Sequence, residues 1–290
     1  MRRRHGIATA RSRGTTSTAA SHPPSCAPSG NAPIARKRPP TARSASAPGA
    51  ACVPGWVSTS WSPEVSAVAE GFRLRVCFRK AGRLRYLSHL ETGRAWERAA
   101  RRAGLPYAVT QGYNPRMKVA FGPALPVGTA GMREYLDITL TRFVPVAQVQ
   151  EGLRASIVEE LAPVECGYVS PTEPSLASRL TIAEYEVELE RGVPPQELER
   201  SLDALMRTGG LETEHKGKQK FFDLAVVLPK EPEVMSDAGR AAVRVWVRMG
   251  PHGSLRPETF MSAAIGPGRP VAVTRTELFI EDEQGWIRPL

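Results

Sequence analysis

Apolar and polar residues alternate along several short segments of this chain. Over residues 72–78, apolar side chains stand at every second position, with Arg73 and Arg75 between the first three, which is the period of a strand buried on one face. Residues 134–140 repeat this period, with Leu136, Ile138 and Leu140 on the inner side. Further strands are predicted at residues 107–110, 117–121, 164–169, 181–190, 211–215, 221–228, 241–249 and 271–280.

Helical spacing marks four other segments. Ser88 opens the sequence Ser-His-Leu-Glu, in which Ser88 and Glu91 can exchange hydrogen bonds as a capping box, and Gly104 stops the pattern. The sequence therefore predicts a helix over residues 88–103. Three more are predicted near residues 146–157, 194–206 and 257–265.

The predicted elements occur twice in the same order. Both halves run strand, helix, strands, strand, helix, strand, which is typical of the ferredoxin-like split βαβ unit, an antiparallel sheet with two helices on one face. We therefore predict an α+β fold of two tandem ferredoxin-like units, with domains at residues 71–170 and 180–290. A single larger α+β sheet is the alternative.

Residues 1–70 lack this patterning and are rich in Arg, Ser, Pro and Ala. Residues 1–66 hold nine basic residues against one acid, Glu64. Such a segment buries too little apolar surface to offset its ordering entropy, so we expect disorder. Its composition also resembles a transit peptide. A variable tail and a start codon placed too far upstream are the other interpretations.

Charge is distributed unevenly over the 290 residues, whose net charge is +10. Residues 1–66 carry +8, residues 67–131 carry +9 and residues 132–290 carry −7. A basic first domain and an acidic second one predict a directed electrostatic surface rather than general adhesion to other molecules.

Several kinds of chemistry lack local support. The four cysteines (Cys26, Cys52, Cys77 and Cys166) form no CxxC or CxxxC pair, so we predict no metal site and no iron–sulfur cluster. Cys77 and Cys166 fall in predicted strands, where small buried side chains are expected. No GxGxxG, P-loop, HExxH or GxSxG motif occurs, and no cofactor is predicted. This cysteine usage, without a run of about 18 apolar residues, predicts a cytoplasmic protein with no membrane contact.

The predicted helix at residues 88–103 carries a row of arginines. A step of 100° per residue places four of them within about a third of its circumference, opposite Trp96 and the alanines. Like charges at this spacing disfavour an isolated helix, and guanidinium groups match phosphate oxygens. We therefore predict phosphate contacts by Arg94, Arg98, Arg101 and Arg102. A solvated face, or pairing with acids of the second domain, is the alternative.

The segment Gly-Tyr-Asn-Pro-Arg-Met-Lys, residues 112–118, combines an aromatic residue, an amide and two cations in a predicted turn. On an exposed loop, Tyr113 could stack on a base while Arg116 and Lys118 hold the backbone of single-stranded RNA. Asn114 completes this candidate set. The alternative is a rigid turn with Tyr113 packed inward.

The apolar stretch at residues 122–128 contains two prolines between two glycines. It cannot form a regular helix or a central strand. We expect a stiff loop that packs across the first domain and fixes the preceding turn in place.

His89 is the candidate for catalysis. It lies beside the basic cluster, where it could act as the general base of RNA cleavage. The helical wheel places it toward the apolar side, so we interpret it as a buried, hydrogen-bonded histidine.

The same stretches resemble a known family. Residues 85–106 (RYLSHLETGRAWERAARRAGLP), 111–128 (QGYNPRMKVAFGPALPVG) and 134–140 (EYLDITL) are similar to the bacterial radical SAM-linked protein, a domain found free or fused behind a radical SAM enzyme. The similarity is clearest over residues 72–189. It implies a role in RNA modification or processing. Because this chain lacks a CxxxCxxC motif, it also implies a radical SAM partner in trans.

Three functional hypotheses follow. The first is a non-catalytic RNA-binding accessory protein that positions RNA for a separate enzyme. The second is a metal-independent endoribonuclease that uses His89. The third is a protein-interaction module whose basic surface docks on an acidic partner, such as a radical SAM enzyme.

Overall fold

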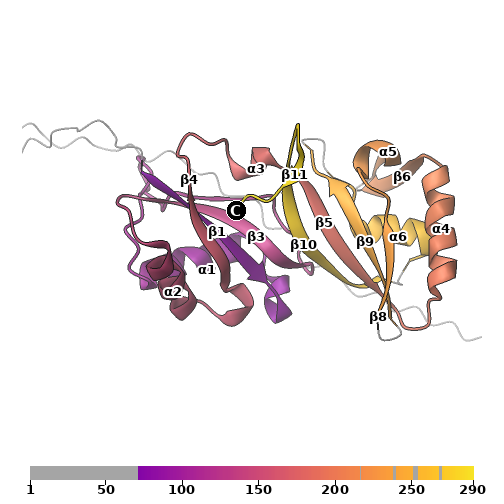
Figure 1. Ribbon diagram of the computed structural model, residues 1–290, viewed down its shortest axis with the longest axis horizontal. Helices are drawn as coiled ribbons and strands as arrows, with labels where there is room; N and C mark the ends of the chain where they lie inside the picture. Colours follow the sequence, from indigo (N-terminus) through magenta and orange to yellow (C-terminus); the bar gives the residue numbers. More distant parts are fainter. Residues whose placement is uncertain (1–70, 216, 238–239, 251–253, 268–269) are drawn as a thin grey trace, which may run out of the picture. The chain divides into compact units, whose positions relative to one another are not determined.

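One nine-stranded mixed sheet organises the part of the chain that the computed structural model describes, residues 71–215, 217–237, 240–250, 254–267 and 270–290 (Figure 1). The predicted disorder of residues 1–70 lies outside it. The strand order is β4-β1-β3-β10-β5-β9-β8, with β2 beside β3 and β11 beside β10, while β6 and β7 form a separate hairpin. The strands are β1 (Phe72–Lys80), β2 (Val119–Phe121), β3 (Ala130–Leu140), β4 (Pro163–Val169), β5 (Leu180–Leu189), β6 (Gly210–His215), β7 (Lys218–Asp223), β8 (Glu233–Asp237), β9 (Arg240–Arg248), β10 (Pro270–Asp282) and β11 (Gly285–Ile287).

All four predicted helices are present, together with shorter ones. They are η1 (Gly82–Tyr86), α1 (His89–Arg102), α2 (Val146–Ser156), η2 (Glu159–Leu161), α3 (Leu176–Arg179), α4 (Pro195–Arg207), α5 (Leu224–Val227) and α6 (Pro257–Ile265). Within the described ranges, none of these helices is long and apolar enough to cross a membrane.

In the first half, the alternating pattern of the strands buries one face under two helices. Val76 of β1 and Ile138 of β3 are fully buried and pack in one cluster with Trp96 of α1 and Leu153 of α2. α1 and α2 therefore cover the same face of β1, β3 and β4 (Figure 1). This packing leaves the opposite side of α1 free to carry charge.

The second half builds its own core on the same plan. Val187 of β5 and Val245 of β9 are fully buried and share a cluster with Leu198 of α4 and Phe260 of α6. The β6–β7 hairpin and α5 are inserted between α4 and β8. α4 and α6 contact each other and close this core.

A short parallel pairing joins the two halves. β3 pairs with β10 at Ala130–Thr274 and Gly131–Arg275, whereas the C-terminal part of β3 pairs with β2 along the same edge. The strand order is thus β4-β1-β3-β2 in the first half and β10-β5-β9-β8 in the second. The fold is α+β with one large mixed sheet, and the described residues all fall in one compact unit.

Two predicted strands need correction, and two strands of the structure were not predicted. The strand predicted at residues 221–228 ends at Asp223, because the Asp223 side chain accepts a hydrogen bond from Ala225 N (3.0 Å) and starts the short helix α5. The strand predicted at residues 107–110 is only two isolated bridges, at Tyr107 and Val109. β8 and β11 were not predicted, because each is short; each pairs with the strand directly before or after it in the sequence, β8 with β9 and β11 with β10.

Candidate nucleic-acid interface

α1 begins and ends with clear local signals. Ser88 N donates to Glu91 Oε2 (2.8 Å) and Glu91 N donates to Ser88 Oγ (3.3 Å), so the predicted capping box is confirmed. The hydrogen bond from the Ser88 amide lowers the pKa of Glu91. Gly104 has φ +64°, a conformation that favours glycine, and it stops the helix.

The arginine row lies on the exposed side of α1, opposite buried Trp96. Arg101 pairs with Glu97 within the helix, with 3.3 Å between Nη2 and Oε2. Among the described residues, the other three make no ion pair, so acids of the second half do not neutralise them. All four predicted arginines are exposed: Arg94, Arg98, Arg101 and Arg102.

The predicted turn is the tip of a narrow hairpin. Thr110 N donates to Arg116 O (2.7 Å), and Arg116 N donates to Thr110 Oγ1 (3.0 Å). Lys118 N donates to Ala108 O (2.8 Å) at the base. These bonds tie the two arms together just below the tip, so the tip is presented on a fixed stem.

Residues 111–116 at this tip are exposed without a break. Tyr113 has a relative exposure of 108%, so the inward-packed interpretation of this residue is wrong. Asn114, Arg116 and Lys118 are exposed as well. Among the described residues, none of these three side chains makes an ion pair. Proteins that bind single-stranded nucleic acids combine exposed aromatic rings with cations, and the tip places both together.

The loop at residues 122–128 does not reach this tip through any hydrogen bond of the described residues. Leu125 is buried, Gly128 N donates to Arg85 O (3.0 Å), and Pro123 O accepts from Arg275 Nη2 (2.8 Å). The loop therefore packs on the first half as expected, but it anchors to the second half rather than to the turn.

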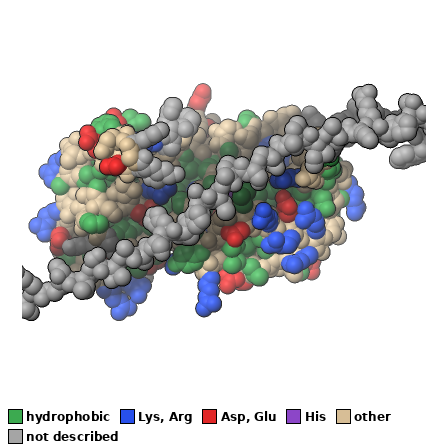
Figure 2. Space-filling model, turned by 180° about the vertical axis from the view of Figure 1, so that it is seen from behind, with side chains coloured by type: hydrophobic (Ala, Val, Ile, Leu, Met, Phe, Trp, Pro, Cys, Tyr) green, Lys and Arg blue, Asp and Glu red, His purple; other side chains and the backbone are tan. Residues whose placement is uncertain are grey.

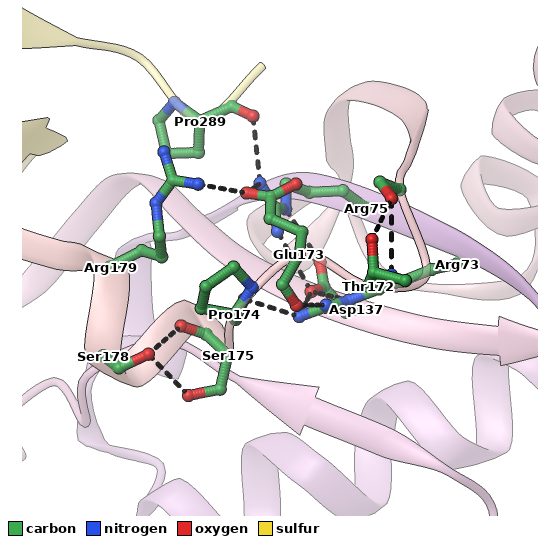
Figure 3. A network of polar contacts seen from close by, with 11 residues as sticks. Arg73, Arg75, Asp137, Thr172, Glu173, Pro174, Ser175, Ser178, Arg179 and Pro289 are labelled. Carbon is green, nitrogen blue, oxygen red and sulfur yellow. Dashed lines mark hydrogen bonds and ion pairs between the residues drawn. The ribbon is translucent and has the colours of Figure 1, made fainter.

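Counting charge by segment overstates the basic surface. Arg75 is buried and its Nε donates to Asp137 Oδ1 (2.9 Å), while its Nη1 reaches Glu173 Oε1 (3.1 Å) and Pro289 O (3.2 Å). Arg73 also pairs with Asp137 (2.7 Å). Figure 3 shows these groups converging from β1, β3, residues 172–175 and the C-terminal end. These arginines hold the structure together.

Lys80 is another cation that does not contribute to the basic surface. It is buried, and its Nζ donates to Leu87 O (2.6 Å) at the entry to α1. Burial lowers the pKa of this amine. Lys and Arg side chains nevertheless gather over the first half of the sheet in Figure 2. The unpaired ones among the described residues of η1, α1 and the hairpin are Arg83, Arg85, Arg94, Arg98, Arg102, Arg116 and Lys118.

His89 is exposed, so its interpretation as a buried, hydrogen-bonded residue is wrong. It is the first residue of α1, and its ring packs edge-to-face on Phe121 (5.3 Å between ring centroids). Among the described residues, no side chain hydrogen-bonds it.

The described cysteines are structural. Cys77 and Cys166 are both buried and free, as predicted. Burial raises the pKa of each thiol to about 12. No group of three His, Cys, Asp or Glu in the described ranges could hold a metal ion.

One buried ion pair could not be predicted from the sequence. Arg275 of β10 is buried, and its Nε donates to Glu134 Oε1 (2.8 Å) on β3, with a second contact from Nη2 to the other carboxylate oxygen. Tyr185 of β5 is buried as well, and Arg275 pairs with it across β5 and β10. These residues come from three strands that lie far apart in sequence, so no local pattern connects them.

Comparison with known protein families identifies the family of this chain. Residues 73–257 match the family described as an uncharacterized protein conserved in bacteria (DUF2344). The chain belongs to this family. The match contains α1, the hairpin and the following loop, and it extends beyond the stretch where the sequence resemblance is clearest. The family description names no radical SAM protein, so that association stays a prediction.

Other comparisons add little to the DUF2344 assignment. No curated protein matches the chain. Among solved structures, a Cbf5–Nop10–Gar1 complex is similar with a TM-score of 0.39 and 13% identity, over 74% of this chain and 51% of the other. An archaeal box H/ACA sRNP Nop10–Cbf5 complex has a TM-score of 0.36 and 15% identity, over 72% and 50%. The chain thus spans about half the length of these proteins, and scores this low assign it no function.

Proposed function

We propose that this DUF2344 protein binds single-stranded RNA through the exposed face of α1 and the hairpin tip, and positions it for a separate enzyme. The observation that carries this proposal is the row Arg94, Arg98 and Arg102. These three cations stand four residues apart on one exposed face, without an acid partner among the described residues.

The energetics of this row favour an anionic ligand. Like charges four residues apart cost an isolated helix about 0.2–0.5 kcal/mol per pair, and the row contains two such pairs. Arg101, by contrast, forms an ion pair with Glu97. Phosphates spaced along a nucleic-acid backbone would turn this repulsion into attraction, because each guanidinium can donate two hydrogen bonds to one phosphate.

The hairpin tip adds an exposed aromatic ring to the basic face of α1. Tyr113 is fully exposed on a stem that backbone hydrogen bonds hold in place. Stacking of an unpaired base on an aromatic ring contributes about 1–3 kcal/mol. RNA is the favoured nucleic acid because its recognition targets loops and single strands with unstacked bases.

A second candidate function is docking of a protein partner, such as a radical SAM enzyme in trans. Apolar side chains at the start of α1 favour it, because Leu90 is 71% exposed and Tyr86 is 59% exposed. Co-purification of a partner that survives ribonuclease treatment would support docking over RNA binding.

The strand order supports a finer description of the fold. In the ferredoxin-like unit, the fourth strand flanks the first, then the third and the second follow. β4-β1-β3-β2 and β10-β5-β9-β8 both follow this order, each with two helices. We therefore propose that each half of the sheet, residues 71–170 and residues 180–290, is a ferredoxin-like domain.

A salt titration tests RNA binding by the full chain. A labelled single-stranded RNA is titrated by fluorescence anisotropy at increasing NaCl, and the logarithm of affinity should fall by about 0.7 per phosphate contact for each tenfold increase in salt. The double variant Arg98→Glu/Arg102→Glu should weaken binding and flatten this slope.

The matched control reverses two exposed arginines on the other long helix. Arg200 and Arg207 of α4 each donate from Nε to a backbone carbonyl of their own helix (3.1 Å). The variant Arg200→Glu/Arg207→Glu changes the net charge equally, so it should keep the wild-type slope. An unchanged slope in the α1 variant would refute the assignment of this face.

A further inference from the structure

A cavity of about 570 Å³ opens where the two halves of the sheet meet. Residues 123–126, between β2 and β3, form one wall. α3, β5 and the residues leading into α6 form the others, and Arg275 of β10 lies at its base. This volume lies within the range of about 300–1,000 Å³ that is typical of small-molecule sites. The cavity is separate from the α1 face and the hairpin.

Buried hydrogen bonds hold the base of the cavity in place. Arg275 is bound to Glu134 and donates to Pro123 O (2.8 Å), so the charge pair that joins β3 and β10 also fixes the wall at residues 123–126. Tyr185 is buried beside it, on the neighbouring strand β5, and also lines the cavity. The cavity is therefore formed before any ligand enters, which reduces the entropy cost of binding.

The lining combines an apolar surface with unpaired polar groups. Among the described residues that line it there are two arginines and no acid. Arg275 is neutralised by Glu134, whereas Arg256 is exposed and makes no ion pair in the described part of the chain. Thr181 Oγ1 is buried there without a hydrogen-bond partner. Glu258, in the first turn of α6, acts electrostatically on Tyr185, and its Oε2 is buried without a hydrogen-bond partner among the described residues.

The remaining walls are formed largely by proline, alanine, leucine and methionine side chains, including Pro123, Pro126 and Met249. Such a surface accepts the face of a planar ring. Hydroxyl groups can donate to and accept from the edge of that ring. Arg256 directly precedes α6, so a negative group would meet its guanidinium together with the backbone amides of Glu258 and Thr259, since Pro257 at the first helical position has no N–H to donate.

The cavity nevertheless lies close to the start of α1. A smaller cleft contains His89 and Thr92 of α1 together with Phe121, and Pro123 lines both this cleft and the large cavity. The start of α1 and the cavity are thus separated by a single wall.

We propose that this cavity binds one nucleotide, with its base against the apolar walls and its phosphate at Arg256. The nucleotide is either a free nucleoside monophosphate or an unpaired nucleotide of the RNA bound at α1. The second source rests on the proposed function, while the first does not.

Isothermal titration of the full chain with the four nucleoside monophosphates, and with the matching nucleosides, tests the free ligand. Arg256→Gln should weaken binding of the preferred monophosphate about tenfold to a hundredfold, since it removes a hydrogen bond to a charged group. The nucleoside should bind both proteins alike. Arg200→Gln, which removes an exposed arginine from α4, should leave every titration unchanged.

A second variant fills the cavity without touching its charges. Ala177 is exposed on α3 and lines the cavity, so Ala177→Phe should exclude the ring and abolish binding of monophosphate and nucleoside together. Unaltered thermal unfolding of this variant would show that the fold is retained. Equal binding by wild type, Arg256→Gln and Ala177→Phe would overturn the proposal.

RNA cross-linking separates the two sources. RNA that carries 4-thiouridine should cross-link to residues 177–185 in the wild type and not in Ala177→Phe. If only the RNA gives this result, the ligand is a nucleotide within a chain. Arg98→Glu/Arg102→Glu should abolish that cross-link but preserve binding of free monophosphate, so failure of the α1 assignment and failure of the cavity give different results. Absence of both monophosphate binding and the cross-link overturns the proposal.

Discussion

Arg275 and Glu134 lie 141 positions apart and are joined by a buried, bidentate ion pair. Arg275 belongs to β10 and Glu134 to β3, the two strands whose short parallel pairing connects the halves of the sheet. The pair therefore links the halves chemically at the same point where the backbone links them.

Breaking this pair should be strongly destabilising. Glu134→Gln leaves the Arg275 charge buried without its counterion, so the free energy of unfolding should fall by about 3–5 kcal/mol. Urea denaturation measures this loss. The double variant Arg275→Met/Glu134→Met should recover much of it, because neither charge remains.

The exposed pair Arg248–Glu281 is the control for that experiment. Its side chains are 37% and 34% exposed, and an exposed pair contributes about 0–1 kcal/mol. Glu281→Gln should accordingly have a small effect. Similar losses at Glu134 and Glu281 would contradict the role assigned to the buried pair.

Removing one arginine from the α1 row should stabilise the protein in the absence of ligand. Arg98→Gln eliminates two repulsions, with Arg94 and Arg102, and should raise the free energy of unfolding by a few tenths of a kcal/mol at low salt. The gain should vanish at high salt, where exposed charges are screened. Thermal unfolding at two salt concentrations measures it. A destabilised variant would mean that Arg98 already has a stabilising partner.

Tyr113 should matter for RNA and not for folding. Tyr113→Ala should weaken binding of single-stranded RNA about fivefold to a hundredfold, which corresponds to loss of one stacked base. Its midpoint of thermal unfolding should equal that of the wild type, since the ring is fully exposed. Tyr113→Phe keeps the ring and should keep the affinity. Equal weakening by both variants would point to the hydroxyl instead.

Glu91 predicts a pH dependence of stability. Hydrogen bonds from Ser88 lower its pKa below the usual 4.5 in the folded state, so the stability it contributes is present above that value. That contribution is lost as the pH falls through the lower, folded-state pKa. The stability difference between wild type and Glu91→Gln should therefore be present at neutral pH and disappear in acid. A difference that grows in acid would contradict it.

The described thiols should be inert in the native protein. Burial raises the pKa of Cys77 and Cys166 to about 12, so both stay protonated at pH 8 and out of contact with reagents. In a Cys26→Ser/Cys52→Ser variant, a thiol reagent should react slowly at pH 8 and quickly once urea is added. Fast reaction without urea would show that one of these strands opens.

Local features of this protein could be predicted, whereas features that depend on distant contacts could not. The cap formed by Ser88 and Glu91 needs only neighbours, and a step of 100° per residue suffices to place the arginines on one side of α1. His89 was misplaced because a helical wheel does not show that the first turn of a helix extends past the core.

Charge was the less predictable part of the candidate site. Arg73, Arg75 and Lys80 contribute to the basic segment when it is counted along the chain, yet their partners are Asp137, Glu173 and a backbone carbonyl. Nothing in the spacing of the arginines distinguishes these from the exposed ones on α1. The position of Arg73 and Arg75 on β1 distinguishes them from the exposed arginines only once it is known that their face of the strand is covered.

The contact between Arg75 and Pro289 has a consequence for synthesis of the protein. Arg75 lies on β1, the first of the described strands, and one of its three partners is the carbonyl of Pro289, 214 positions further along the chain. Domains commonly fold in order as they leave the ribosome. Here the buried guanidinium of β1 lacks one of its hydrogen bonds until Pro289 has been made and has left the ribosome. The nascent first half therefore carries an incompletely bonded charge while the second half is being synthesised.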